Sequence, residues 1–292
     1  MASATAVPSM KRAALEWVAR REGLGMHEMV AVGDHYNDLE ALLAAGVGVA
    51  VREAPPEVLA AAERVIGGPG TGGVADLDAA NLRETLPKFF STPHRLQQFE
   101  DALVEDPRNR KSACKDDIQF AQARREMAFV IDRMLKSGDI PIRTVHGDTK
   151  LNNVLFCDRT GRAQCIVDLD TCMPGYALYD FGDLVRFTAA TTSEDEQDLD
   201  KVGTDLTLYR ALVEGYLHGT RGSLSKGEIE LMPFAARLVT YTIGLRFLAD
   251  HLAGDVYFKV SRDNHNLDRA RVQFRMVERM EEQADAMAVT SD

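Results

Sequence analysis

A polar loop that leads into a short hairpin, within residues 145 to 168, constrains the fold of this chain more than any other stretch. The loop covers residues 146 to 153 and is followed by an apolar run at 154 to 156. A second apolar run, at 165 to 167, follows the turn-forming residues 158 to 161. Short apolar runs on both sides of such a turn predict a β-hairpin.

Three polar residues of this stretch are Asp148, Asn153 and Asp168, and the intervals between them are informative. An Asp at the start of a loop can accept a proton from an incoming hydroxyl. Asn and Asp oxygens are ligands that Mg²⁺ favours. The interval from Asp148 to Asn153 is that of the protein-kinase catalytic loop. Turn-forming residues are common in such loops and are the alternative for each residue alone. The ordered set favours ATP-dependent phosphoryl transfer.

The rest of the chain after residue 80 is expected to be mainly helical. Residues 95 to 136 predict one or two long helices, and a helix should begin at 179 to 183. In that helix Asp180 is placed to accept hydrogen bonds from the backbone of the catalytic loop. Apolar stripes of helical period mark three further stretches, at 206–217, 228–252 and 267–287.

The first 75 residues alternate instead between helices and short apolar strands. Helices are predicted at 10–24 and 38–45 and from Pro55 to Ala62, and strands at 29–32 and 47–51. This alternation favours an α/β layer with parallel strands. We therefore expect an α/β segment at 1–80, a partial parallel sheet, and a mainly α kinase-like C-terminal lobe at 81–292.

Residues 88 to 292 resemble the aminoglycoside phosphotransferase/choline kinase superfamily, and within it the N-acetylhexosamine 1-kinases. The motifs that carry this resemblance are His146-Gly147-Asp148-Thr149-Lys150-Leu151-Asn152-Asn153, Val167-Asp168-Leu169-Asp170-Thr171, Met173-Pro174-Gly175, Leu178-Tyr179-Asp180-Phe181-Gly182-Asp183 and Pro93-His94-Arg95-Leu96-Gln97-Gln98-Phe99-Glu100. The resemblance implies that Asp148 is the base toward the sugar 1-hydroxyl and that Asn153 and Asp168 bind Mg²⁺ and ATP. It also implies that Arg246 and Tyr257 line the sugar pocket, although a helix-surface Arg and a packed Tyr explain these two residues equally well.

Residues 10 to 75 resemble the C-terminal part of the core of a Cof-like haloacid-dehalogenase phosphatase. The resemblance lies in Lys11, in Gly33-Asp34-His35-Tyr36-Asn37-Asp38 and in Ala45-Gly46-Val47-Gly48-Val49. It implies that Asp34 and Asp38 bind Mg²⁺ and that Lys11 neutralises a phosphate. Such phosphatases attack phosphate with an Asp in a D-x-D pattern, and residues 1 to 10 contain none. We therefore expect a vestigial metal site.

Residues 1 to 87 do not supply the antiparallel strands, Lys and glycine loop with which the kinase superfamily covers ATP. Gly68-Pro69-Gly70-Thr71-Gly72-Gly73 matches G-x-G-x-x-G, but no Lys-bearing strand follows it, so a plain loop is expected. Three hypotheses stay open: a sugar phosphotransferase weakened by the missing lobe, a Mg²⁺-dependent phosphatase, and a non-catalytic fusion or fragment.

Composition and net charge exclude several classes of binding partner. A net charge of −11 and a pI of 5.2 argue against nucleic-acid and anionic-membrane surfaces. The four cysteines lack the spacing of a zinc site, and no signal peptide or membrane-spanning run is present in the sequence. We expect a cytoplasmic protein with a small-molecule sugar as its partner, and the sequence leaves its oligomeric state open.

Overall fold

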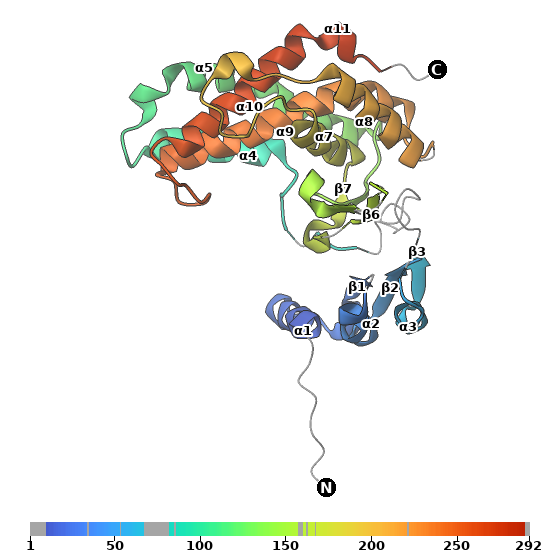
Figure 1. Cartoon of the computed structure of the whole chain (residues 1–292). Helices are drawn as coiled ribbons and strands as arrows, with labels where there is room; N and C mark the ends of the chain where they lie inside the picture. The colour runs from blue at the N-terminus through green and yellow to red at the C-terminus, as the bar shows by residue number, and fades with distance from the viewer. Residues whose placement is uncertain are drawn as a thin grey trace. The chain divides into compact units, whose positions relative to one another are not determined.

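The computed structural model describes residues 10–33, 35–52, 54–66, 82–84, 86–156, 160–161, 163–166, 168–220 and 222–289 (Figure 1). Its backbone contacts divide the chain into two compact units. The smaller unit comprises Met1–Leu82 and Asn153–Asp170, and the larger unit comprises Arg83–Asn152 and Thr171–Asp292. The sequence analysis placed a boundary between residues 80 and 81. The contacts place it two residues later and group the hairpin with the smaller unit.

The smaller unit contains a three-stranded parallel sheet in the order β1-β2-β3, as the alternating pattern predicts. Ala31 pairs with Gly48, and Ala50 pairs with Val65. The hairpin of antiparallel β5 and β6 is also confirmed. The elements are α1 (Met10–Glu22), β1 (Val30–Gly33), α2 (Leu39–Ala44), β2 (Val47–Val51), α3 (Pro56–Ala61), β3 (Arg64–Ile66), β5 (Val154–Phe156) and β6 (Ala163–Ile166).

Glycines let the central strand of this sheet pack closely on its neighbours. Val49 and Ala50 of β2 are fully buried. A Cβ atom at Gly46 would lie 2.0 Å from the carbonyl oxygen of His27, and one at Gly48 would lie 2.6 Å from that of Leu42. Both distances are far below van der Waals contact, so this backbone packing tolerates only glycine at the two positions.

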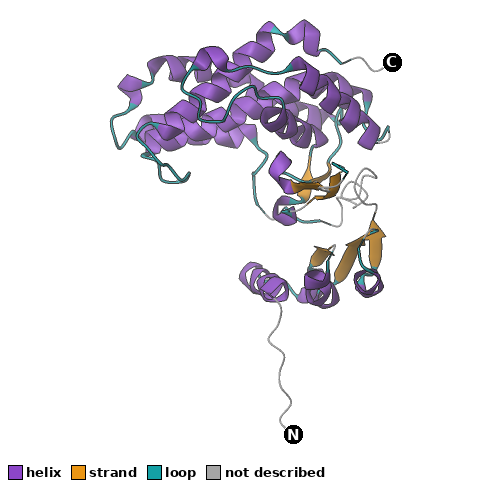
Figure 2. Ribbon diagram, in the orientation of Figure 1, coloured by secondary structure: helices purple, strands orange, loops and turns teal. Residues whose placement is uncertain are grey.

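The larger unit is built mainly from helices, with one small antiparallel sheet of β4 and β7 (Figure 2). No described helix combines the length and hydrophobicity needed to cross a bilayer. The elements are α4 (Thr92–Glu105), α5 (Lys115–Ala123), α6 (Val130–Ser137), β4 (Arg143–Val145), β7 (Met173–Gly175), α7 (Ala177–Thr188), α8 (Leu206–Gly219), α9 (Lys226–Ala253), α10 (His265–Glu282) and α11 (Ala284–Met287).

Helix α9 forms the centre of the larger unit because it packs against α4, α7 and α10. The consecutive residues Leu238, Val239, Thr240 and Tyr241 are all buried, with exposed fractions of 1% or less. These residues point in several directions around the helix, which is the pattern of a helix surrounded by other elements. At its start the Ser225 hydroxyl and the Glu228 carboxylate form a capping box.

The prediction of one or two long helices over residues 95–136 is wrong. The segment is divided into α4, α5 and α6 by short 3₁₀ turns at Lys111–Ala113 and Arg125–Phe129. The first break follows from Asp106, which adopts a left-handed backbone conformation with φ of 31° and accepts a hydrogen bond from the Arg110 amide (2.8 Å). Pro107 comes next, and a helix rarely continues through the residue before a proline.

Helix α7 meets α9 at Gly182. A Cβ atom on this residue would lie 2.6 Å from the carbonyl oxygen of Ala235 and 2.6 Å from Cγ2 of Val239. Gly215 in α8 offers a matched contrast, because a Cβ atom there would meet nothing within 4 Å.

Gly182→Ala is expected to lower the free energy of unfolding of the larger unit by about 1–2 kcal/mol, since overpacking outweighs the better helix propensity of alanine. Gly215→Ala is expected to raise it by up to about 1 kcal/mol. Urea unfolding followed by far-UV circular dichroism measures both changes. Equal stabilisation by the two substitutions would contradict this packing.

Candidate active site

Helix α7 holds the loop that carries Asp148 through the buried side chain of Asp180. The backbone N–H groups of His146 and Gly147 donate to its two carboxylate oxygens, at 2.7 and 2.8 Å. These are the hydrogen bonds expected from the sequence. A carboxylate that accepts hydrogen bonds from two successive backbone N–H groups fixes the conformation of the residues that donate them. Here these are the first two residues of the loop.

A second acidic residue of α7 extends this attachment. Asp183, also buried, accepts a hydrogen bond from the Thr149 amide (3.1 Å) and forms an ion pair with Arg186 (3.0 Å). Arg186 is itself buried and also contacts Glu194 (2.8 Å). The sequence analysis did not assign roles to Asp183 and Arg186. Their spacing from Asp180 by three and six residues, which places them on one face of α7, was the available signal.

Gly147 gives the loop its shape. Its φ angle is +82°, a left-handed conformation that favours glycine. A Cβ atom there would lie 2.9 Å both from the Phe90 ring and from the carbonyl oxygen of Thr171. The Thr171 hydroxyl in turn donates to the carbonyl oxygen of His146 (2.7 Å). Backbone and side-chain contacts thus clamp the residues directly before Asp148.

Asp148 itself stays partly accessible at this fixed position. Its side chain is 27% exposed, and its carboxylate lies 2.5 Å from the ammonium group of Lys150. The charged pair therefore places one acceptor and one donor at the surface of a loop whose backbone is anchored from beneath. Such a group can orient a hydroxyl and accept its proton.

The other two residues of the predicted centre, Asn153 and Asp168, belong to the smaller unit. Asn153 is buried at the start of the hairpin. Asp168 follows strand β6, is exposed, and has a φ angle of 65°. Each supplies an oxygen donor of the kind that Mg²⁺ takes. The assembly of Asp148, Asn153 and Asp168 into one centre stays a prediction.

Arg246 and Tyr257, the predicted sugar-binding residues, lie together on one pocket of the larger unit. The pocket has a volume of about 270 Å³ and is lined by residues of α4, α9 and the loop after α9. Guanidinium nitrogen and phenol oxygen are 3.5 Å apart, and the guanidinium lies over the Tyr257 and Phe258 rings. Asp148 does not line this pocket.

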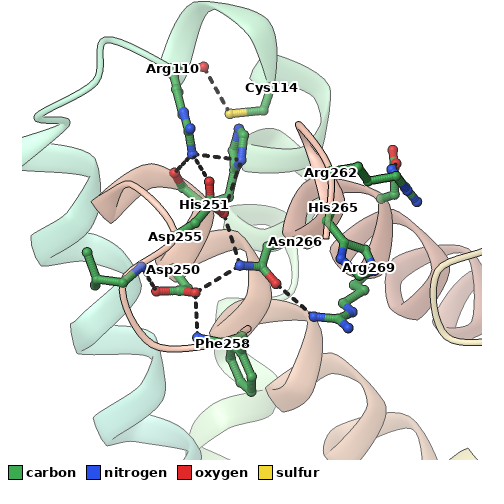
Figure 3. A network of polar contacts seen from close by, with 12 residues as sticks. Arg110, Cys114, Asp250, His251, Asp255, Phe258, Arg262, His265, Asn266 and Arg269 are labelled. Atoms are coloured by element: carbon green, nitrogen blue, oxygen red, sulfur yellow. Dashed lines mark hydrogen bonds and ion pairs between the residues drawn. The ribbon is translucent and has the colours of Figure 1, made fainter. Parts of the chain in front are cut away.

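The loop that carries Tyr257 is anchored by buried Asp250 (Figure 3). Its carboxylate accepts the backbone N–H groups of Val256, Tyr257 and Phe258 at 2.8–2.9 Å, and an N–H group of Asn266 at 2.9 Å. Four donors compensate the buried negative charge. The conformation of residues 256–258 therefore depends on one side chain of α9.

Arg110 secures the first part of the same loop (Figure 3). Its guanidinium contacts the Asp255 carboxylate at 2.5 Å and the carbonyl oxygen of His251 at 2.7 Å. Asn266 donates to the other oxygen of Asp255 (3.0 Å), and Arg269 donates to the Asn266 side-chain oxygen (3.2 Å). The sequence analysis identified none of this network, because its members are separated by up to about 160 residues along the chain.

In the smaller unit Lys11 forms an ion pair with Asp38, which is buried. The amide of His35 also donates to the Asp38 carboxylate (3.1 Å). Asp34, the other proposed ligand of the vestigial phosphatase-like site, lies outside the described residues. No cluster of three or more His, Cys, Asp and Glu side chains that could hold a metal ion occurs in the described part of the chain.

Comparison with known proteins identifies the family. The sequence model of the phosphotransferase enzyme family (APH) matches residues 13–216. This match covers more than half of the 292 residues, and the chain therefore belongs to this phosphotransferase family. The matched region contains the loop at 146–153 and the hairpin, and it ends before α9.

Part of the chain is also similar to a curated phosphatase. The phosphoglycolate phosphatase of Methanoculleus marisnigri is 56% identical to this chain over 81 residues, which amount to 28% of the chain. The same residues are 33% of the relative, so the chain spans about a third of that protein's length.

Burial raises the pKa of Asp180 from its ordinary value of 3.8 to about 6, while the hydrogen bonds from Gly147 and His146 oppose the shift. Because the folded pKa is the higher one, the folded protein binds more protons than the unfolded chain between about pH 4 and pH 6. The contribution of Asp180 to the free energy of unfolding therefore falls as the pH rises through this window, by about 3 kcal/mol in total.

Asp180→Asn removes this titration. We expect the free energy of unfolding of the wild type, relative to that of the variant, to decrease as the pH is raised from about 4 to about 7. Urea unfolding at several pH values measures the difference. Parallel pH profiles of the two proteins would show that this carboxyl does not titrate with a raised pKa.

Asp250→Asn is expected to cost about 1–3 kcal/mol of stability, because the amide NH₂ would face N–H donors that then lose their acceptor. The freed loop should also be cleaved faster by chymotrypsin after Tyr257. Asp263→Asn, at an exposed residue 13 positions after Asp250 in the sequence, is the matched control and should change neither quantity. Unchanged cleavage in folded Asp250→Asn would contradict the anchoring role.

Proposed function

We propose that this phosphotransferase moves a phosphoryl group from ATP to a sugar hydroxyl, with the 1-hydroxyl of an N-acetylhexosamine as the acceptor. The observation that carries the proposal is the loop at 146–149. Two buried carboxylates of α7 hold its backbone, and the Asp148 carboxylate remains accessible. A rigidly placed carboxylate is what orienting an acceptor hydroxyl requires.

In this proposal the oxygen of the sugar hydroxyl attacks the phosphorus atom of the transferred group. Asp148 accepts the proton of that hydroxyl during the attack. Lys150, 2.5 Å from the Asp148 carboxylate, keeps that side chain in place. Its ammonium group also supplies a positive charge beside the reacting groups, where it would stabilise the negative charge of the phosphoryl group during transfer.

The donor set fits a magnesium ion that is shared with a nucleotide. Asn153 and Asp168 provide one amide and one carboxylate oxygen, and Mg²⁺ is commonly bound by one or two such groups together with phosphates and water. The ion would neutralise charge on the ATP phosphates. A cluster of three or more acidic or imidazole ligands is not required for this role.

The acceptor would occupy the pocket lined by Arg246 and Tyr257. Aromatic faces of Tyr257 and Phe258 suit the apolar face of a sugar ring, and the guanidinium of Arg246 can donate to its hydroxyl or N-acetyl oxygens. The buried network around Asp250 keeps Tyr257 in position, which lowers the entropy lost on binding.

A phosphatase activity of the smaller unit is the second candidate. It is favoured by the Lys11–Asp38 ion pair and by the 56% identity with a phosphoglycolate phosphatase over 81 residues. In this alternative Asp34 and Asp38 would bind Mg²⁺ and Lys11 would contact the phosphate.

Purified chain with ATP, Mg²⁺ and N-acetylglucosamine is expected to form sugar 1-phosphate, and Asp148→Asn should reduce the rate about 10²–10⁴-fold because the proton acceptor is lost. Asp139→Asn, the same substitution at an exposed residue of the larger unit, is the control and should keep full activity. Coupled detection of ADP together with chromatography of the sugar phosphate measures the rate.

Full activity of Asp148→Asn would overturn the assigned role. Release of phosphate from a generic phosphomonoester, lost in Asp34→Asn, would favour the phosphatase instead. Neither activity in the wild type would favour a non-catalytic protein.

A further inference from the structure

Two arginines face the same pocket from different helices. Arg95 belongs to the first turns of α4 and Arg246 to α9, and both line the pocket. The two helices are joined close by, because the hydroxyls of Thr92 and Thr242 are 2.9 Å apart. Among the ion pairs of the described residues, neither arginine has a carboxylate partner.

The hydrogen bonds of Arg95 leave its charge uncompensated. One terminal nitrogen donates to the Gln98 side-chain oxygen (2.9 Å) and the other weakly to the carbonyl oxygen of Phe89 (3.4 Å). Its Nε atom is shielded from solvent without a described partner. Burial lowers the pKa of Arg95, and the nearby charge of Arg246 lowers it further. A half-buried cation beside a like charge is a site that an anion would stabilise.

Arg246 is held by aromatic rings rather than by acids. Its guanidinium lies 5.3 Å from the centre of the Phe258 ring, 5.6 Å from that of Tyr257 and 6.0 Å from that of Phe89. Such cation–π contacts fix the plane of the group but use few of its N–H donors. The remaining donors can reach a ligand in the pocket.

The acidic residues of the pocket lie away from these two cations or are already satisfied. Asp101 and Glu105 follow Arg95 by six and ten residues on α4, about 9 and 15 Å along the helix. Both are exposed, so water and salt screen them. Asp250 accepts four hydrogen bonds within the protein. One end of the pocket is therefore positive.

We propose that Arg95 and Arg246 form an anion-binding pair that holds a carboxylate or phosphate group of the acceptor. Arginine donors match both groups in charge-assisted, two-point hydrogen bonding, and a neutral sugar lacks the negative charge that strengthens it. The inference rests on the proposed function in that the ligand is a sugar, and it adds that an acidic sugar binds more tightly than the neutral one. The positive end is also connected to the catalytic loop, because Arg95 contacts Phe89 and the next residue, Phe90, lies against Gly147.

Isothermal titration calorimetry of the full chain tests this with three probes: N-acetylglucosamine, N-acetylglucosamine 6-phosphate and glucuronate. At least one acidic probe should bind about tenfold or more tightly than the neutral one, since charge-assisted hydrogen bonds are the stronger kind. Which acidic probe binds distinguishes phosphate from carboxylate.

Arg95→Gln and Arg246→Gln should each lower the affinity for the acidic probe by about tenfold or more. Asp101→Asn should strengthen it modestly by removing a repulsive charge. Arg133→Gln, at a 62% exposed residue of α6, is the matched control and should have no effect. If Arg95→Gln fails to fold, Arg95→Lys is the deciding variant. It keeps the positive charge but cannot make the two-point hydrogen bonds, so it should lose part of the affinity for the acidic probe.

Equal affinity for the neutral and acidic probes would overturn the anion-binding pair, as would unchanged binding by folded Arg95→Gln. Arginine-dependent binding of an acidic probe in a wild-type chain without transfer activity would refute the proposed function and leave the anion site intact.

Discussion

The hydrogen bonds from the backbone of the loop at 146–153 to Asp180 are the interaction on which the rest of the candidate site depends. A loop of this kind has backbone N–H groups that no regular element satisfies, and a buried one without an acceptor costs about 1–3 kcal/mol. Asp180 accepts two of them, and Asp183 accepts a third, from Thr149, two residues further along the loop. The loop is thus shaped by α7, and Asp148 inherits its position from that attachment.

The same device appears a second time at the pocket. Asp250, a buried aspartate of α9, collects three consecutive N–H groups of the loop that carries Tyr257. Helices α7 and α9 pack directly on each other through Gly182. Two irregular segments with proposed chemical roles are therefore mounted on adjoining helices of one core. Buried carboxylates replace the hydrogen bonds that regular secondary structure would provide.

Much of this arrangement was predictable from local sequence patterns. The alternation of apolar runs predicted the parallel sheet, and the helical stripes predicted α8, α9 and α10, because the burial of apolar side chains sets the period of each pattern. Strand β3 was missed since it has only three residues, of which Arg64 and Val65 are exposed. The breaks after α4 were missed because the turn at Asp106 and Pro107 was read as the charged middle of a helix.

The candidate site was only partly predictable for a physical reason. Asp148 and Asp180 lie in short motifs. Arg95 and Arg110 instead act together with residues of α9 and of the loop after it, about 150 residues distant along the chain, and no local pattern encodes such pairs. Phosphorus NMR of the wild-type chain with ATP, Mg²⁺ and an N-acetylhexosamine tests the central claim most directly. A sugar-phosphate ester is expected to form in equal amount with ADP. Formation of inorganic phosphate alone, with no ester, would contradict it.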